Sequence, residues 1–282
     1  MIQTVFVAGA GTMGLDIAQV FARSGRNVWV RDISEQIIET AKSRLSGSYA
    51  KLASKGKLTS AEAEAQQGRI HFTVATQPAA EADLVVEAIV ERIDLKKSVF
   101  KELDAICKPA CIFASNTSSV SITEMAIASG RPDRFLGMHF FNPATVMKLV
   151  ELIRALTTSE ETYLTARGLC EELGKDPVEV QDSPGFVVNR ILAPMMNEAA
   201  FLLEEHVASA EDIDKALRLG ANHPMGPLQL ADLVGLDVLV AIMDVLYSET
   251  HDPKFRACFL LRKMVRAGTL GRKTGQGFYN YR

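Results

Sequence analysis

The sequence predicts an α/β protein in which a doubly wound, mostly parallel sheet is followed by an all-helical C-terminal domain. Three observations support this prediction. Short apolar runs alternate with helical patterns up to residue 182, a glycine-rich turn follows the first run, and only helical patterns remain beyond residue 182. At 282 residues the chain is long for a single core, so we expect two domains, 1–182 and 183–282.

The predicted strands are short apolar runs separated by helical or polar stretches. They cover residues 4–8, 27–30, 71–74, 84–90, 111–115 and 135–139. The run at 84–90 is apolar enough to be buried on both faces, as strands of parallel sheets are. Helices are expected after the first strand and near 34–67 and 94–106. This alternation favours right-handed crossovers between parallel strands.

The chain changes character at Asp182-Ser183-Pro184-Gly185. This segment combines a residue that caps helix N-termini with an early proline, which is typical of a helix start. Beyond it the pattern predicts helices at 186–206, 210–219, 226–248 and 253–267, and no strand. Because these helices carry much apolar surface, we expect the C-terminal domain to form a homodimer.

The first strand leads into a glycine-rich turn that reads Gly9-Ala10-Gly11-Thr12-Met13-Gly14. Gly9 permits a tight turn, Gly11 lets the backbone approach a pyrophosphate, and Gly14 lets the following helix pack closely on the strand. The pyrophosphate then lies at a helix N-terminus, where free N–H groups favour an anion. These features predict a Rossmann-type dinucleotide-binding domain. The simpler alternative is a glycine turn without a ligand.

Asp32 follows the second strand, 18 residues after Gly14. A carboxylate at this spacing can bind the hydroxyls of the adenosine ribose. It also repels a 2′-phosphate, so the sequence predicts NAD rather than NADP as the cofactor. The adjacent Arg31 weighs against this preference.

His139 precedes Glu151 by twelve residues, and the turn-like pair Asn142-Pro143 lies between them. If the chain reverses there, the two residues lie opposite each other on adjacent antiparallel strands. Imidazole is the side chain best suited to exchanging a proton near neutral pH, and a carboxylate on the far ring nitrogen fixes its tautomer. His139 is therefore the candidate general base. The alternative is a half-buried histidine beside a chance acid.

Composition argues against several other classes of protein. A net charge of −3 gives no reason to expect nucleic-acid binding, and no apolar run approaches the ~18 residues of a membrane span. The first strand begins so early that we expect no leader peptide. The four cysteines are scattered without metal-binding spacing, which indicates reduced packing residues in a cytoplasmic protein and no metal site.

Further motifs accompany these residues, namely Ser115-Asn116-Thr117-Ser118-Ser119, His139-Phe140-Phe141-Asn142-Pro143, the segment from Asp182 to Arg190, Gly226-Pro227 with Asp232, and the segment from Gly271 to Tyr279. Through them nearly the whole chain resembles the 3-hydroxyacyl-CoA dehydrogenases, most closely the short bacterial 3-hydroxybutyryl-CoA dehydrogenases. The resemblance implies NAD-dependent interconversion of (S)-3-hydroxyacyl-CoA and 3-ketoacyl-CoA, an activity of fatty-acid and butanoate metabolism.

The same resemblance implies four catalytic residues. His139 corresponds to the general base and Glu151 to its partner, while Ser118 and Asn189 correspond to polar contacts with the substrate. From the residues alone, a helix N-cap at Ser118 and a polar helix position at Asn189 remain alternatives. The resemblance also implies that the cofactor contacts Gly9, Gly11, Thr12, Met13, Gly14, Asp32, Glu91, Lys96, Ser118, Asn142 and Lys273.

Coenzyme A needs a positive site for its phosphates. Residues 41–57 hold five basic residues and no acid, and Lys51 and Lys55, four apart, share one helix face. The resemblance implicates the same segment, with Ser48, Lys51 and Lys55 as substrate-binding residues. A solvated charged face is the alternative interpretation.

Two other functions are compatible with part of these motifs. A free hydroxy-acid or sugar-acid dehydrogenase would share many of these motifs but would not need Lys51 and Lys55. A non-catalytic NAD-binding structural protein would keep the fold, but the complete set of candidate catalytic residues argues against it. The short-chain dehydrogenases are excluded, because the chain lacks their Tyr-x-x-x-Lys pair and glycine pattern.

Overall fold

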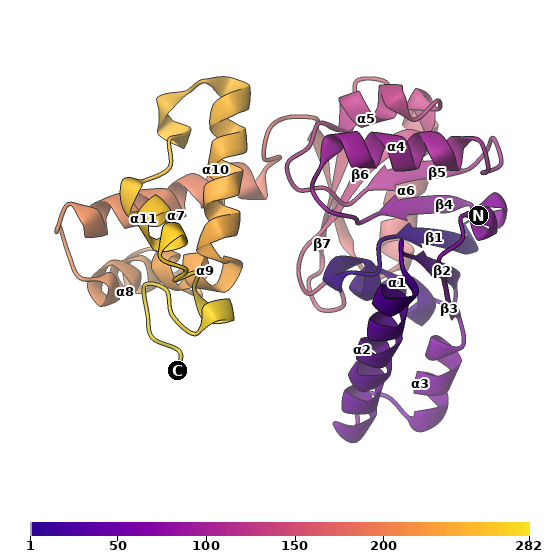
Figure 1. Ribbon diagram of the computed structural model, residues 1–282, viewed down its shortest axis with the longest axis horizontal. Helices are drawn as coiled ribbons and strands as arrows, with labels where there is room; N and C mark the ends of the chain where they lie inside the picture. Colours follow the sequence, from indigo (N-terminus) through magenta and orange to yellow (C-terminus); the bar gives the residue numbers. More distant parts are fainter. Residues whose placement is uncertain (1) are drawn as a thin grey trace. The chain divides into compact units, whose positions relative to one another are not determined.

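The computed structural model describes residues 2–282, which form two compact units (Figure 1). The N-terminal unit ends at Ser183 and is built on one sheet. The C-terminal unit begins at Pro184 and is helical. The predicted combination of a doubly wound α/β fold with an all-helical C-terminal part is confirmed.

The sheet of the N-terminal unit has eight strands within the described residues, in the order β3-β2-β1-β4-β5-β6-β7-β8. Neighbouring strands run parallel, except that β6 and β7 are antiparallel. The strands are β1 (Thr4–Ala8), β2 (Asn27–Arg31), β3 (Ile70–Thr73), β4 (Leu84–Glu87), β5 (Ile112–Ser115), β6 (Phe135–Phe140), β7 (Leu149–Arg154) and β8 (Asp176–Gln181). Each of the strands predicted from apolar runs is present.

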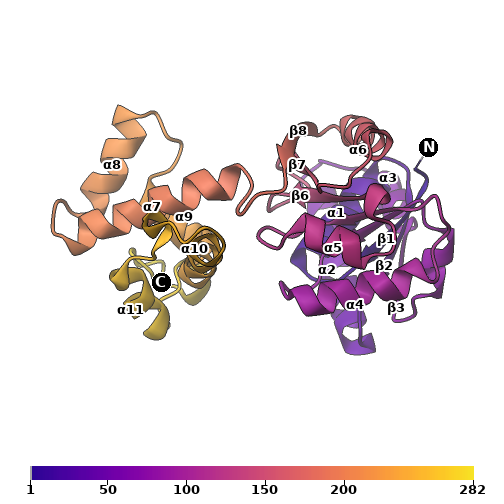
Figure 2. The same cartoon turned by 90° about the horizontal axis from the view of Figure 1, so that it is seen from above.

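Helices cover both faces of this sheet, as Figure 2 shows for α4 and α6. The helices of this unit are α1 (Thr12–Arg23), α2 (Glu35–Ser54), α3 (Ser60–Gln67), α4 (Ile93–Asp104), α5 (Ile122–Ala128) and α6 (Glu160–Glu172). On one face, Ile17 of α1 and Leu169 of α6 share a buried core with alternate strand residues. On the other face, Phe100 of α4 packs on Phe113 and Phe135. Burial of alternating residues on both sides fixes the register of the central strands.

The N-terminal unit departs from the predicted elements at several places. The stretch expected as one helix at 34–67 forms two, because the chain turns at Gly56 (φ +64°) and Thr59 caps a new helix. The strand expected at 84–90 ends at Glu87. The edge strand β8 was not predicted, since its side chains are mostly exposed and form no apolar run.

The C-terminal unit consists of helices around a core of buried apolar residues. They are α7 (Val188–Glu204), α8 (Ala210–Gly220), α9 (Pro227–Val234), α10 (Leu236–Thr250) and α11 (Phe259–Arg266). The helix expected at 226–248 is interrupted at Gly235, whose φ of +101° is incompatible with a helix. Among residues 2–282, no helix combines the length and apolar character that crossing a membrane requires.

The last residues of the chain are fastened to the C-terminal unit by Asp232. This side chain is 1% exposed, and its carboxylate accepts hydrogen bonds from the backbone N–H groups of Phe278 and Tyr279 (2.9 and 3.0 Å) and from the Tyr281 hydroxyl (3.1 Å). Gly277 lies so close that a Cβ there would collide with the carboxylate. The carboxylate thus holds the segment that carries Lys273.

We predict that Asp232→Ala lowers the free energy of unfolding by about 3 kcal/mol, because several buried donors lose a charged acceptor. Chemical denaturation of the whole protein measures the change. Glu249→Ala, at an exposed position of α10, is the control and should change stability by less than about 0.5 kcal/mol. Equal effects of the two substitutions would contradict the structural role of Asp232.

Candidate active site

The glycine-rich turn between β1 and α1 has the shape of an anion cradle. A Cβ at Gly9 (φ +114°) would collide with the Ala88 carbonyl, and one at Gly14 with the Gly9 carbonyl. At Gly11 a Cβ would meet nothing within 4 Å, so there is open space beside the backbone. Gly11 is also the N-cap of α1 and offers no side chain to cap its N–H groups. The geometry therefore fits the pyrophosphate of a dinucleotide.

Asp32 lies beside this turn at the end of β2. Its Oδ2 accepts a hydrogen bond from the Ala10 N–H (2.8 Å) and its Oδ1 one from the Ile33 N–H (2.7 Å). The carboxylate thus braces the glycine turn, a role that the sequence did not reveal. Two carboxylate oxygens can accept about four hydrogen bonds, so acceptor capacity for ribose hydroxyls remains.

Two further residues of the turn are fixed by α1 and its neighbours. The Thr12 hydroxyl accepts a hydrogen bond from Arg44 of α2 (3.0 Å), and Met13 packs against the core under the sheet. The hydrogen bond of Thr12 and the packing of Met13 therefore fix the position of the turn in the absence of a ligand.

The order of the strands places a ligand crevice next to this turn. From β1 the sheet continues through β2 and β3 on one side and through β4 and β5 on the other. Ligands of doubly wound sheets bind outside the carboxyl ends of the strands at such a reversal. Glu87 ends β4 and Ser115 ends β5, so both mark this edge.

His139 and Glu151 form a buried hydrogen-bonded pair. They are partners in the antiparallel register of β6 and β7, as the spacing predicted, and His139 Nδ1 lies 2.7 Å from Glu151 Oε2. His139 is 6% exposed and Glu151 is 1% exposed. The carboxylate requires a proton on Nδ1, which leaves Nε2, on the opposite side of the ring, as the nitrogen that can accept one.

The turn between these two strands is clamped by two charged side chains. Asp16 of α1 accepts a hydrogen bond from the Ala144 N–H (3.0 Å), and Lys175 donates to the carbonyls of Ala144 (2.6 Å) and Met147 (2.8 Å). Burial raises the pKa of Asp16 and lowers the pKa of Lys175, since each is held partly away from water. Asn142 lies exposed in this turn. Sequence reasoning missed both clamping residues.

Ser118 lies in the loop that follows β5. Its backbone N–H donates to Glu91 Oε1 (2.9 Å), and Thr117 and Ser119 donate their hydroxyls to the same oxygen. Asn116 accepts a hydrogen bond from the backbone N–H of Phe140 (2.8 Å), the residue after His139. The hydrogen bond of Asn116 therefore connects residues 116–119, which we call the serine loop, to strand β6, which carries His139. Ser118 does not cap the next helix, because Ser121 does.

Glu91 and Lys96 contact each other. The Lys96 ammonium is 1% exposed and lies 3.0 Å from Glu91 Oε2 and 2.6 Å from Glu87 Oε1. Lys96 is therefore part of a buried ion-pair cluster, and its approach to a cofactor stays a prediction. The Glu87 side chain was not recognised in the sequence, although an acid that ends a buried apolar strand was a signal.

The pKa of Glu91 is lowered by its neighbours. Burial acts against this by favouring the neutral acid, but the charge of Lys96 and the hydrogen bonds from Thr117 and Ser118 outweigh it. Glu91 is therefore an ionised acceptor near neutral pH, which suits its place at the centre of the serine loop.

Of the expected coenzyme A residues, Ser48 and Lys51 lie on α2 and Lys55 is its C-cap residue. Lys51 and Lys55 are exposed near its C-terminal end, and no other described residue forms a salt bridge with them. Ser48 donates its hydroxyl to Gln19 of α1 (3.1 Å). The lysines are thus available to an anionic ligand in solution.

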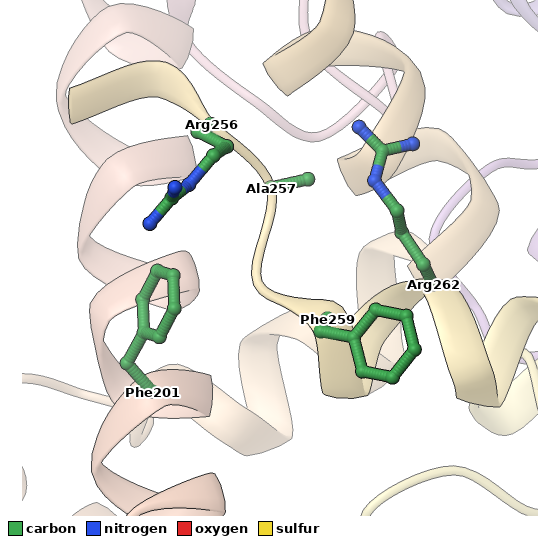
Figure 3. A pocket seen from close by; sticks show the side chains of 5 residues that line it. All are labelled: Phe201, Arg256, Ala257, Phe259 and Arg262. Carbon is green, nitrogen blue, oxygen red and sulfur yellow. The ribbon is translucent and has the colours of Figure 1, made fainter. Parts of the chain in front are cut away.

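Two candidate residues belong to the C-terminal unit. Asn189 is in the first turn of α7, and Lys273 forms an ion pair with Asp237 of α10. Their contacts with substrate and cofactor stay predictions. A pocket of about 320 Å³ in the same unit is lined by Phe201, Arg256, Ala257, Phe259 and Arg262 (Figure 3). None of the candidate site residues lines it.

Family models match both units of the chain. The model for the NAD-binding domain of 3-hydroxyacyl-CoA dehydrogenase matches residues 4–183, and the model for the C-terminal domain matches residues 185–281. The chain belongs to the 3-hydroxyacyl-CoA dehydrogenase family. This confirms the family assignment and the NAD-binding domain inferred from the sequence.

Relatives within the 3-hydroxyacyl-CoA dehydrogenase family cover the full chain. A probable 3-hydroxybutyryl-CoA dehydrogenase of Deinococcus radiodurans is 54% identical over 98% of this chain and 99% of its own. One of Bacillus subtilis is 51% identical over 99% and 98%. The crystal structure of (S)-3-hydroxybutyryl-CoA dehydrogenase from Ralstonia eutropha is 50% identical, covers both chains completely and superimposes with a TM-score of 0.96.

We predict that Glu91→Gln lowers the free energy of unfolding at pH 7 by on the order of 1 kcal/mol, through weaker bonds to Lys96 and the serine loop. The folded-state pKa of Glu91 is lowered, so its contribution is complete above the unfolded pKa of about 4.3 and is lost as pH falls through the folded pKa. Urea denaturation between pH 7 and pH 3 measures the difference.

In the same series, Glu102→Gln removes an exposed carboxylate of α4 and serves as the control. A difference between wild type and Glu91→Gln that stayed constant down to pH 3 would contradict the lowered pKa.

Proposed function

We propose that this chain interconverts (S)-3-hydroxyacyl-CoA and 3-ketoacyl-CoA with NAD, and that 3-hydroxybutyryl-CoA and acetoacetyl-CoA are its principal pair. The observation that carries the proposal is the buried His139–Glu151 pair at the carboxyl edge of a dinucleotide-binding sheet. Membership of the family and the names of the full-length relatives support the choice of substrate. Fatty-acid or butanoate metabolism is the context that we propose.

His139 acts as the general base in this reaction. Nε2 takes the proton of the substrate hydroxyl while the hydride leaves the same carbon, and in reverse the protonated ring donates to the 3-keto oxygen. When bound, NAD supplies the acceptor for that hydride. Glu151 keeps Nδ1 protonated and stabilises the charged ring, so the ring neither turns nor loses the reactive tautomer.

Ser118 and Asn189 orient the substrate by hydrogen bonds to the reacting oxygen or the thioester carbonyl. The bonds from Thr117, Ser118 and Ser119 to Glu91 hold the serine loop in place, which reduces the entropy lost when the substrate binds. Asn189 lies in the first turn of α7.

The cofactor lies against the glycine turn in this proposal. Gly11 and the N-terminus of α1 receive the pyrophosphate, and Asp32 binds the adenosine ribose and selects NAD over NADP. Glu91, Lys96, Asn142 and Lys273 complete the contacts. Lys51 and Lys55 bind the phosphates of coenzyme A, with Ser48 beside them.

We further propose that residues 183–282 form the substrate and dimerisation domain of a homodimer in the cytoplasm. Exposed apolar side chains on its helices support association, among them Ile191, Leu233, Val238 and Phe259. Four buried, free cysteines agree with a reducing compartment.

We predict that His139→Gln reduces turnover of acetoacetyl-CoA at least a hundredfold, because glutamine cannot exchange the proton. The NADH dissociation constant should change less than threefold, about 0.6 kcal/mol, and both quantities can be followed by NADH absorbance and fluorescence.

His71→Gln, in strand β3 at the far end of the sheet, is the matched control and should retain full turnover. Unimpaired turnover by His139→Gln would exclude the proposed base.

We predict that Lys51→Ala combined with Lys55→Ala raises KM for acetoacetyl-CoA about tenfold, since two charged phosphate contacts are lost. KM for a truncated acetoacetyl thioester without the nucleotide should stay the same. Steady-state kinetics with both substrates provides the measurement.

Lys101→Ala combined with Lys215→Ala removes the same charge from exposed positions elsewhere and is the control. If KM rises equally for the two thioesters, the lysines do not bind coenzyme A. High activity with free acetoacetate would instead favour a free hydroxy acid as substrate.

A further inference from the structure

Glu87 and Glu91 share a single lysine. Lys96 Nζ lies 2.6 Å from Glu87 Oε1 and 3.0 Å from Glu91 Oε2. Glu87 is fully buried, Lys96 is 1% exposed, and the Glu91 side chain is 38% exposed. The cluster lies at the carboxyl ends of β4 and β5, beside the reversal of strand order where the proposed function places the cofactor.

The Glu87 carboxylate is surrounded by hydrogen-bond donors. Oε1 accepts from the Ile89 N–H (2.7 Å) and from Lys96, and Oε2 accepts from the Ser115 hydroxyl (2.6 Å). That hydroxyl in turn accepts a hydrogen bond from the Thr117 N–H (3.2 Å). Ile89, Lys96 and Ser115 each supply a donor to the carboxylate, and Lys96 forms an ion pair with it.

The Glu91 carboxylate is likewise surrounded by donors, which hold its pKa below the ordinary value. Its Oε1 accepts from Thr117, Ser118 and Ser119, and its Oε2 faces Lys96. Two carboxylates and one ammonium leave the cluster with a net charge of −1.

The neighbouring charges do not offset this excess. Arg92 pairs with Asp94, and Lys97 pairs with Glu124, so each of these cations already has an acid of its own. The N-terminus of α4 adds a partial positive charge, which stabilises the carboxylates but does not cancel a full unit. A partly buried charge of −1 therefore remains at the carboxyl ends of β4 and β5, where the lower dielectric lets it act over a longer range than in water.

We propose that Glu87, through this uncompensated charge, strengthens the binding of oxidised NAD relative to that of NADH. The oxidised nicotinamide ring is a cation and the reduced ring is neutral, so a nearby negative charge stabilises only the oxidised form. The inference rests on the proposed function, because it requires that the dinucleotide occupies this edge. Glu87 is a residue that sets cofactor preference and does not exchange the proton.

Glu87→Gln is the decisive variant. Its amide oxygen can keep the bonds from Ile89 and Lys96, and its NH₂ group can donate to Ser115 once that hydroxyl rotates, so shape and hydrogen bonding are retained while one charge is lost. We expect the ratio of the NAD⁺ to the NADH dissociation constant to rise about tenfold, mostly through weaker NAD⁺ binding. Titration calorimetry with the full-length protein, at constant ionic strength and without substrate, measures both constants.

Glu102→Gln makes the same chemical change on the exposed face of α4 and should leave the ratio unchanged. Glu91→Gln removes one charge from the partly exposed side of the cluster and should raise the ratio in the same direction. It decides the question if Glu87→Gln does not fold.

The outcomes separate the two proposals. A proportional loss of affinity for both dinucleotides, or no change in either, would overturn the inference and leave the proposed function standing. Failure of the wild-type protein to bind either dinucleotide would overturn the proposed function itself.

Discussion

The hydrogen bond between His139 and Glu151 depends on a single reversal of strand direction. In a parallel pair, residues twelve apart along the chain could not face each other, because the connection back to the start of the sheet needs a helix. The antiparallel pairing of β6 and β7 puts them in direct register and buries both. In that low-dielectric setting the bond is strong, and breaking it would take a charge-assisted hydrogen bond away from a buried carboxylate.

Several polar contacts around this pair stabilise the register of β6 against β7. Asp16 and Lys175 hold the backbone of Ala144 from opposite sides, and Asn116 joins the serine loop to the backbone after His139. Each contact connects an element of the sheet edge to its neighbour. The site is therefore organised by the N-terminal unit before a ligand binds, which is the arrangement that favours rapid proton transfer.

The same unit also contains buried charge that its ion pairs do not cancel. Burying a carboxylate is costly, and Glu87 is tolerated because backbone, hydroxyl and ammonium donors surround it completely. The C-terminal unit uses the same principle for a different purpose. There the Asp232 carboxylate accepts hydrogen bonds from the backbone of the last residues of the chain. Asp214 of α8 accepts hydrogen bonds from the Tyr279 hydroxyl and from two backbone N–H groups at the start of α9.

The sequence by itself determined the strands that form apolar runs, the glycine turn, the helical character of the C-terminal unit and the pairing of His139 with Glu151. These features follow from local periodicity, from backbone geometry that only glycine permits, and from spacing about a turn. The tertiary structure alone decided the break in the helix at Gly235, the edge strand β8, the clamp formed by Asp16 and Lys175, and the sharing of Lys96 by Glu87 and Glu91. The clamp joins residues more than 25 positions apart, and the carboxylates bracket their lysine because β4 ends where α4 begins, so both arrangements arise only once the sheet has assembled.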